Sequence, residues 1–277
     1  MTAKHTIVAM RLLSLICICA YRKQIELLPI LTNHMISLSL QHGKNDATLM
    51  AYSLYGVLSC ATGMYKKGNK FAALTIHNTE PFRSFNNTFA LTSAYCLISR
   101  WHYPLHKVGL KLHALYKDSL HNGDYAAASL VLEAYVAVIC LSGNNIDRVS
   151  AQLHGHMQTI VKYEKHNDSY KSLLIGQQFL DNLSNKSSAP HIFNGKYWQE
   201  QQIEGHENTH VFGLFYLLKT INGFLCGLSN TELCSYMLKA NKNIHFFTSN
   251  PLLPTFYSTH TLILCATLRE HKKTSQY

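Results

Sequence analysis

Charged residues are scarce in this 277-residue chain, and acidic residues are scarcer than basic ones. Only 14% of the residues are charged, and 25 Lys and Arg against 15 Asp and Glu give a formal net charge of +10. Such an excess can attract nucleic acid or an anionic membrane. The basic residues are scattered, however, and their longest runs are the pairs Lys66-Lys67 and Lys272-Lys273. We therefore expect no nucleic-acid partner, because no basic stripe with interleaved aromatic residues is present.

Long apolar runs and paired cysteines are also lacking. No stretch is long enough to predict a convincing membrane span. The segment from Leu12 to Ala20 is similar to a short signal peptide, but Arg11 interrupts it and it continues into Tyr21-Arg22-Lys23. None of the 8 Cys forms a C-x-x-C pair, and most lie in apolar runs. These patterns favour a cytoplasmic protein with buried free thiols.

What is present is a repeated helical pattern. Apolar residues make up 47% of the chain, which is enough for a sizeable core. Residues 42 to 68 show the pattern best: Gly43 ends one helix, Asp46 is placed to cap the next, and a small residue, Gly56, lies beside tyrosines. First helices of successive pairs begin near residues 46, 86 and 124, at intervals of 40 and 38 residues. The second of these helices is expected to run from Asn86 to Trp101. Asp124 is placed to cap the third, and Gly143 to end it. This period predicts an all-α fold, an α-solenoid of about six antiparallel helix pairs with a tetratricopeptide-like superhelix.

The same pattern predicts how the chain is divided. Residues 1–184 are expected to form an N-terminal helical-repeat array. Residues 185–205 are polar and irregular and are expected to be a loop or a break in the stack. Residues 206–271 should form C-terminal helix pairs of the same solenoid, followed by a frayed tail at 272–277.

Several short motifs follow one another in a fixed order: Ala20-Tyr21, Leu28-Pro29, Leu38-Ser39, Gly43-x-Asn45, Ala51-Tyr52-x-x-Tyr55-Gly56, Gly68, Arg100-Trp101 and Gly123-Asp124-Tyr125-Ala126. In this order they resemble the helical tetratricopeptide-like middle region of very large signalling proteins, over residues 5 to 268. Those proteins join a serine/threonine kinase domain, a P-loop signal-transduction ATPase, this helical region, a GAF domain and a histidine kinase. The chain has no G-x-x-x-x-G-K-S/T loop and no kinase catalytic loop, so the resemblance implies a scaffold segment, a fragment of a larger machine, with protein partners or adjoining signalling domains and no cofactor.

One motif suggests a different function. His206-Glu207-Asn208-Thr209-His210 fits H-E-x-x-H, in which two histidines four residues apart on a helix bind zinc and the glutamate is the general base. Glu232 lies downstream as a possible third ligand. The alternative function is therefore a zinc-dependent peptidase. Gly205 directly precedes the motif, which places it on the first turn of a helix and favours two exposed histidines without a metal.

Aromatic residues recur on the first helices of the predicted pairs. They are expected either to pack between helices or to line a concave groove for a peptide or partner helix. These positions are Tyr52, Tyr55, Tyr95, Trp101, Tyr125 and Tyr135. The sequence thus predicts a non-catalytic interaction module with no catalytic residue, and it leaves open a small-molecule pocket between repeats.

Overall fold

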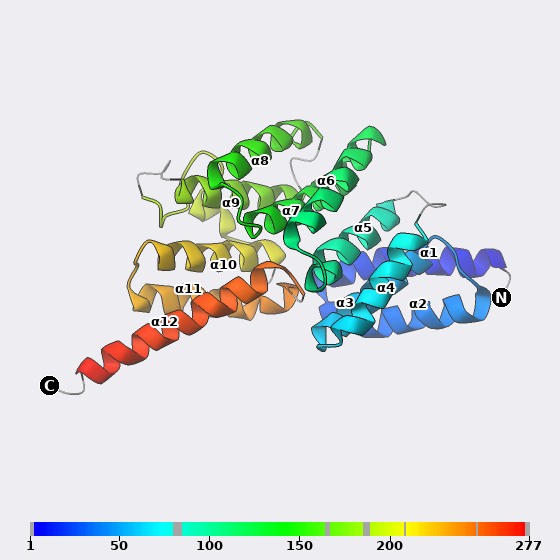
Figure 1. The fold of residues 1–277 in the computed structure, drawn as a ribbon, viewed down its shortest axis with the longest axis horizontal. Coiled ribbons are helices and arrows are strands. Elements are labelled where there is room, and N and C mark those ends of the chain that lie inside the picture. The colour runs from blue at the N-terminus through cyan, green and yellow to red at the C-terminus, as the bar shows by residue number, and fades with distance from the viewer. Residues whose placement is uncertain are drawn as a thin grey trace. The chain divides into compact units, whose positions relative to one another are not determined.

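The computed structural model describes residues 3–79, 85–163, 167–184, 189–207, 209–247 and 249–274. Across these residues the chain forms twelve α-helices and no strand, which confirms the predicted all-α class. The chain divides into two compact units, labelled by element in Figure 1. Unit 1 comprises Met1–Ser142 and Ser249–Pro251, and unit 2 comprises Gly143–Thr248 and Leu252–Tyr277.

Unit 1 contains seven of the α-helices and three short helical turns. In chain order they are α1 (Ala3–Lys23), η1 (Ile25–Leu27), α2 (Leu28–His42), α3 (Thr48–Ala61), α4 (Tyr65–His77), α5 (Phe85–Ser93), the π-helical turn η2 (Ala94–Ile98), η3 (Ser99–Trp101), α6 (Leu105–His121) and α7 (Tyr125–Cys140). The closest helix contacts are those of α3 with α4 and of α6 with α7, and α5 packs mainly on α3 and α7. The pairing therefore differs from the predicted one: α6 and α7, expected in different pairs, pack together, α5 and α6, expected as one pair, touch little, and α7 and α8, expected as one pair, belong to different units.

Unit 2 contains five α-helices and two short 3₁₀ turns. They are α8 (Ile146–Ile160), α9 (Asp168–Leu183), η4 (Glu200–Ile203), α10 (His210–Leu225), α11 (Asn230–Lys242), η5 (Ile244–Phe247) and α12 (Leu252–Thr274). Helix α10 packs against α9, α11 and α12 and against both short turns. The expected tail at 272–277 begins as helix, because α12 continues to Thr274, and residues 275–277 lie outside the described residues.

Local sequence signals set most helix ends. The Asp124 carboxylate accepts a hydrogen bond from the Ala127 amide at 3.0 Å and caps α7, as predicted. Gly43 and Gly143 follow helix ends with φ of 86° and 74°, a left-handed backbone that only glycine adopts without strain. Pro29 lies in the first turn of α2, where a missing amide hydrogen costs no helical bond.

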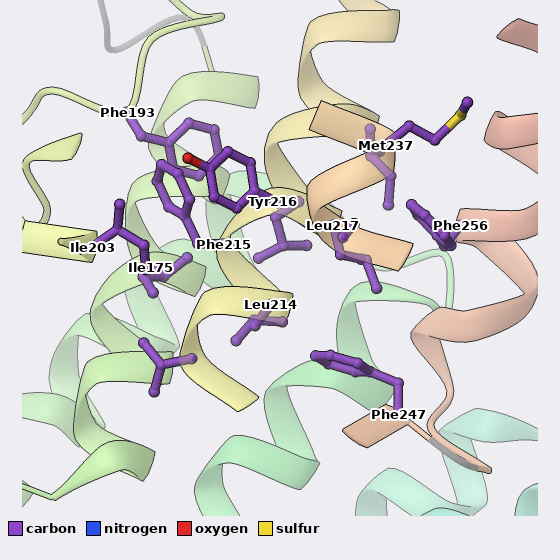
Figure 2. Close-up of a cluster of buried hydrophobic side chains, with 14 of the residues drawn as sticks. Ile175, Phe193, Ile203, Leu214, Phe215, Tyr216, Leu217, Met237, Phe247 and Phe256 are labelled. Atoms are coloured by element: carbon purple, nitrogen blue, oxygen red, sulfur yellow. The ribbon is translucent and has the colours of Figure 1, made fainter. Parts of the chain in front are cut away.

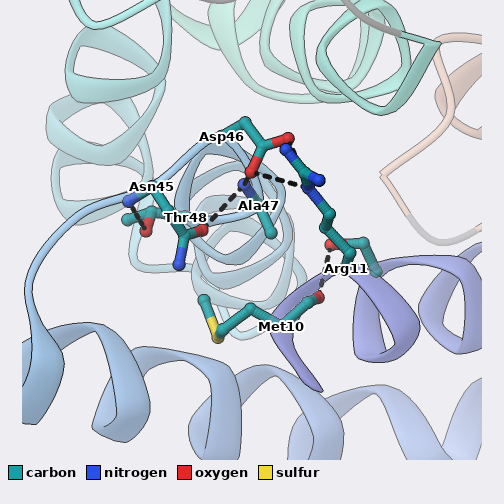
Figure 3. Close-up of polar contacts among 7 residues, drawn as sticks. Met10, Arg11, Asn45, Asp46, Ala47 and Thr48 are labelled. Atoms are coloured by element: carbon teal, nitrogen blue, oxygen red, sulfur yellow. Dashed lines mark hydrogen bonds and ion pairs between the residues drawn. The ribbon is translucent and has the colours of Figure 1, made fainter. Parts of the chain in front are cut away.

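Asp46 does not cap α3, contrary to the sequence prediction. The helix starts at Thr48, and Asn45 closes the turn: its side chain accepts from the Ala47 amide at 2.9 Å, and its amide donates to Thr48 Oγ1 at 3.0 Å. The Asp46 carboxylate instead pairs with Arg11 of α1 at 3.0 Å (Figure 3). Asp46 therefore forms an ion pair with Arg11, which lies 35 residues earlier in the chain, and does not act as the helix cap.

Helices α3 and α4 cross through two glycines. A Cβ added to Gly56 would lie 2.6 Å from Ile98 Cδ1 and 3.2 Å from the Gly68 carbonyl oxygen. A Cβ added to Gly68 would lie 2.5 Å from Cys60 Sγ. Gly56 therefore faces α4, and its small size allows the two backbones to approach closely.

The larger aromatic core lies in unit 2 around α10. Twelve of the sixteen α10 residues are buried. Phe193, in the segment after α9, packs its ring against Phe215 of α10 (Figure 2). The ring of Trp198, from the same segment, also packs against Phe215. Lys219 of α10 bonds Glu200 of η4 at 2.6 Å. The described part of the expected loop, residues 189–205, is therefore anchored to the core of unit 2.

Candidate functional site

The H-E-x-x-H pattern does not form on one helix. His210 is the first residue of α10, and Thr209 is its N-cap, accepting from the Phe212 amide. His206 and Glu207 therefore precede the helix, so the two imidazoles do not share a helix face as a zinc site requires. The prediction that the motif lies on the first helical turn is wrong.

The side chains of the motif have other partners. Lys171 Nζ lies 3.4 Å from His206 Nε2, and the His210 ring stacks on Phe247 with centroids 4.8 Å apart. Glu232 lies in the first turn of α11, where it accepts from Ser229 Oγ at 2.7 Å. Within the described part of the chain, no three His, Cys, Asp or Glu side chains are grouped to hold a metal ion.

The predicted groove residues on α3 pack within their own helix pair. Tyr55 and Tyr52 both contact the Phe71 ring of α4, with centroids 4.6 and 6.1 Å away. Lys67 Nζ donates a hydrogen bond to the Tyr55 hydroxyl at 2.8 Å. It also lies 4.8 Å from the centroid of the Tyr55 ring. These tyrosines join α3 to α4.

Tyr135 repeats this arrangement in the pair of α6 and α7. It is buried, and its ring stacks on His113 with centroids 5.3 Å apart. Burial lowers the pKa of His113, with a smaller contribution from Lys117. Tyr125 and Tyr95 are partly buried, at the start of α7 and in the π-helical turn. Burial raises the pKa of Tyr95.

Trp101 differs from these five residues because it lies at the end of an irregular helix. A single helix is expected from Asn86 to Trp101, but α5 changes into a π-helical turn at Ala94 and a 3₁₀ turn at Ser99. Such π turns are rare in proteins, and those that occur are often found at functional sites. Here the turn places Ile98 in the core and leaves Trp101 38% exposed.

Arg100 holds Trp101 in place. Its guanidinium carbon lies 4.1 Å from the indole centroid, a cation–π contact, and its Nε–H donates to the Ser249 carbonyl at 3.1 Å. Burial lowers the pKa of Arg100. Two thiols lie near the guanidinium, and burial raises the pKa of Cys60 to about 11 and that of Cys96 to about 12. A protonated, buried thiol is a poor nucleophile.

Two turns of unit 1 meet at this tryptophan. The Tyr65 ring lies 4.6 Å from the Trp101 ring, and His102 Nε2 lies 2.9 Å from the Tyr65 carbonyl oxygen. Met64 and Tyr103, next to them in sequence, are about half exposed. We call these four residues, Met64, Tyr65, Trp101 and Tyr103, the two-turn patch.

The surroundings of the two-turn patch are basic. Lys66, Lys67, His102 and Lys107 are exposed beside it in sequence. The segments 47–79 and 94–117 contain no Asp or Glu. An exposed group of aromatic and Met side chains with a basic rim has the composition of a protein-interaction surface, since Tyr, Trp, Met and Arg are enriched there.

Sequence reasoning found one of the four patch residues. Trp101 is among the predicted groove positions. Met64 and Tyr103 lie between helices and Tyr65 is the first residue of α4, so a search for helical periodicity misses them. The signal that could have found them is the pair of aromatic turns Met64-Tyr65 and Trp101-His102-Tyr103-Pro104.

Searches of family models, of curated proteins and of solved structures find no match to this chain.

Proposed function

We propose that this protein is a non-catalytic interaction module, an α-solenoid of stacked antiparallel helix pairs that binds a protein partner through the two-turn patch. The partner segment carries apolar side chains for the aromatic rings and acidic side chains for the surrounding lysines. The exposed stack of Tyr65 on Trp101, held from within by Arg100, is the observation that carries the proposal.

The arrangement of helix pairs supports the solenoid. The pairs α3/α4 and α6/α7 are each joined by a three-residue turn that contains a glycine with positive φ, Gly63 or Gly123. Each pair is also joined by aromatic contacts between its two helices. Repeated pairs of this kind stack into extended binding surfaces and need no catalytic groups.

The resemblance to the helical region of multidomain signalling proteins gives the proposal its context. In that context the partner of the two-turn patch is an adjoining signalling domain, in the same assembly, in the cytoplasm. The geometry of the described residues does not favour the H-E-x-x-H alternative, since His206 precedes α10 and no three metal-binding side chains are grouped.

Site-specific photocrosslinking tests the proposal. A benzophenone amino acid replaces Tyr103 of the patch in one variant and Tyr257 of α12 in a control, because both side chains are about half exposed. The proposal expects a discrete adduct with one protein from position 103 only, which Trp101→Ala abolishes. The same adduct from position 257, or an adduct that survives Trp101→Ala, would refute the proposal.

A further inference from the structure

Helix α1 exposes several large apolar side chains. Its buried stripe consists of Thr6, Met10, Ser14, Cys17 and Ala20, of which only Met10 is large, and Leu13, Ile18 and Tyr21 are partly buried against the same core. Its exposed stripe contains Val8, Leu12, Leu15 and Ile16, which are 56%, 56%, 50% and 48% exposed, together with Cys19. Small residues between helices and large apolar residues outside are typical of helices in contact with lipid.

The rest of unit 1 leaves this stripe uncovered. Within the described residues, α1 packs mainly against α2, η1 and α3 (Figure 1). Ile30 and Leu40 of α2 are also exposed, at 69% and 83%. The sequence predicts no membrane span, yet Lys4–Tyr21 of α1 is long and apolar enough to meet the length and composition criteria for one. A helix with four of its larger apolar side chains in water requires a cover.

The charges of α1 decide between the possible covers. Residues 3–23 contain four Lys and Arg and no Asp or Glu, and Lys4 and Arg11 lie on the exposed stripe itself. Arg11 pairs with Asp46, but its side chain stays 60% exposed, where such a pair is weak. A second copy of α1 would bring like charges together. An anionic bilayer complements both the apolar stripe and the basic residues.

We infer that the exposed stripe of α1 binds the surface of an anionic membrane, with α1 lying in the plane of the interface. The side chains of Val8, Leu12, Leu15 and Ile16 enter the boundary between headgroups and acyl chains. Lys4 and Arg11 face the anionic headgroups. The inner face of α1 stays packed on α2, so the helix does not leave unit 1 to cross the bilayer. This surface is separate from the two-turn patch and does not depend on the proposed partner.

Vesicle sedimentation of the full chain tests this inference. The probe is a set of vesicles containing phosphatidylcholine and phosphatidylserine in equal parts, compared with phosphatidylcholine alone. We expect binding to the anionic vesicles only, and weaker binding at about 1 M salt, where the Debye length falls to about 3 Å. The double variant Leu12→Ser/Ile16→Ser should weaken binding by about 30-fold or more, since it removes two apolar side chains from the interface.

A matched control keeps the test specific. The double variant Leu262→Ser/Leu268→Ser removes two leucines of α12 that are about as exposed as Leu12 and Ile16 of α1. This control variant should bind vesicles like the unmodified chain. Circular dichroism melts confirm that both variants fold. Three results would overturn the inference: no binding to anionic vesicles, equal binding by the α1 variant, or a lipid-free dimer that this variant converts to a monomer. Retention on the membrane after extraction in high salt and alkaline carbonate would also overturn it, because α1 would then span the bilayer.

Discussion

Helices α1 and α10 both consist mainly of apolar residues and have opposite environments. In α10, twelve of sixteen residues are buried, including a lysine, because α9, α11, α12 and two short turns surround it. In α1, Val8, Leu12, Leu15 and Ile16 remain about half exposed. An apolar composition therefore predicts a helix, but it does not predict which other elements will bury that helix.

The same contrast applies to the two units. Unit 2 builds its core from large rings around α10, with Phe193, Phe215, Phe247 and Phe256 almost fully buried. The core cluster around α1 to α3 in unit 1 has Phe89 as its one buried ring and is otherwise built from Ala, Met, Leu and Cys side chains, such as Ala51, Met35, Leu54 and Cys17. A close-packed core of small residues depends on short distances between backbones, whereas an aromatic core depends on individual large side chains.

Alkaline pH should affect unit 1 most strongly, and this is the largest expected effect. Burial raises the pKa of Cys17 and Cys60 to about 11 and that of Cys96 to about 12, from 9.0. Above pH 9 the unfolded thiols ionise while the folded ones stay protonated, so stability is complete below pH 9 and falls as the pH rises toward 11 or 12. Each pKa unit corresponds to about 1.4 kcal/mol.

Hydrogen exchange of the two units as a function of pH measures this effect. We expect unit 1 to lose protection at lower pH than unit 2. Cys96→Ala should reduce the slope of stability against pH, because it removes one of the ionising groups. Equal loss in both units would contradict the assignment of the effect to the buried thiols.

Truncating the aromatic core of α10 is the next largest perturbation. Phe215 is 1% exposed and contacts Phe193, Trp198 and Tyr216. Phe215→Ala should cost about 3–5 kcal/mol, as large-to-small changes of buried rings do. Chemical denaturation measures the loss, and a cost below about 1 kcal/mol would show that α10 is not the centre of the unit 2 core.

Overpacking the glycine crossing of unit 1 should have a smaller effect. Gly56→Leu forces Ile98 and the Gly68 backbone apart and should cost about 1–3 kcal/mol. Gly176→Ala in α9 is the matched control, because nothing lies within 4 Å of its added Cβ and alanine favours a helix by about 1 kcal/mol. The two melting temperatures should move in opposite directions.

The two aspartates predicted as helix caps should differ in the stability that is lost when each is replaced by alanine. Asp124→Ala should cost about 1 kcal/mol, since it removes the bond to the Ala127 amide. Asp46→Ala should cost less, about 0–1 kcal/mol, because Asn45 closes the start of α3 and the pair with Arg11 is exposed. Equal losses in thermal unfolding would contradict the revised role of Asp46.

Replacing an outer residue of α1 should have the smallest effect in water. Leu12 is 56% exposed, so Leu12→Ala should change the free energy of unfolding by about 0.5 kcal/mol or less. Denaturation without lipid measures this. A cost comparable to that of Phe215→Ala would mean that the stripe is buried in the protein itself, and the contrast between α1 and α10 would fail.

Prediction from sequence succeeded where a signal acts within a few residues. Gly43 and Gly143 end helices and Asp124 caps one, because each signal needs only its own backbone and the next three residues. Prediction failed at Asp46, where a contact from α1 competes with the cap. It also failed at His206, because the H-E-x-x-H pattern specifies residue types and not where a helix begins.

The cysteines show the same limit. Cys17, Cys60 and Cys96 are buried as expected, but Cys19, Cys226 and Cys265 are exposed although they also lie among apolar residues. Cys17 and Cys19 are only two residues apart, and the helical turn places them on different faces. Periodicity separates the two faces and does not say which one meets a neighbour.

Local signals along the chain are enough to specify that this protein is helical and where most of its helices begin and end, because those properties depend on hydrogen bonds and backbone angles within one or two turns. They do not specify that Trp101 and Tyr65 stack at adjoining turns, that Gly56 and Gly68 meet, or that α1 exposes Val8, Leu12, Leu15 and Ile16. These outcomes depend on which segments become neighbours, and that is set by the packing of the whole unit.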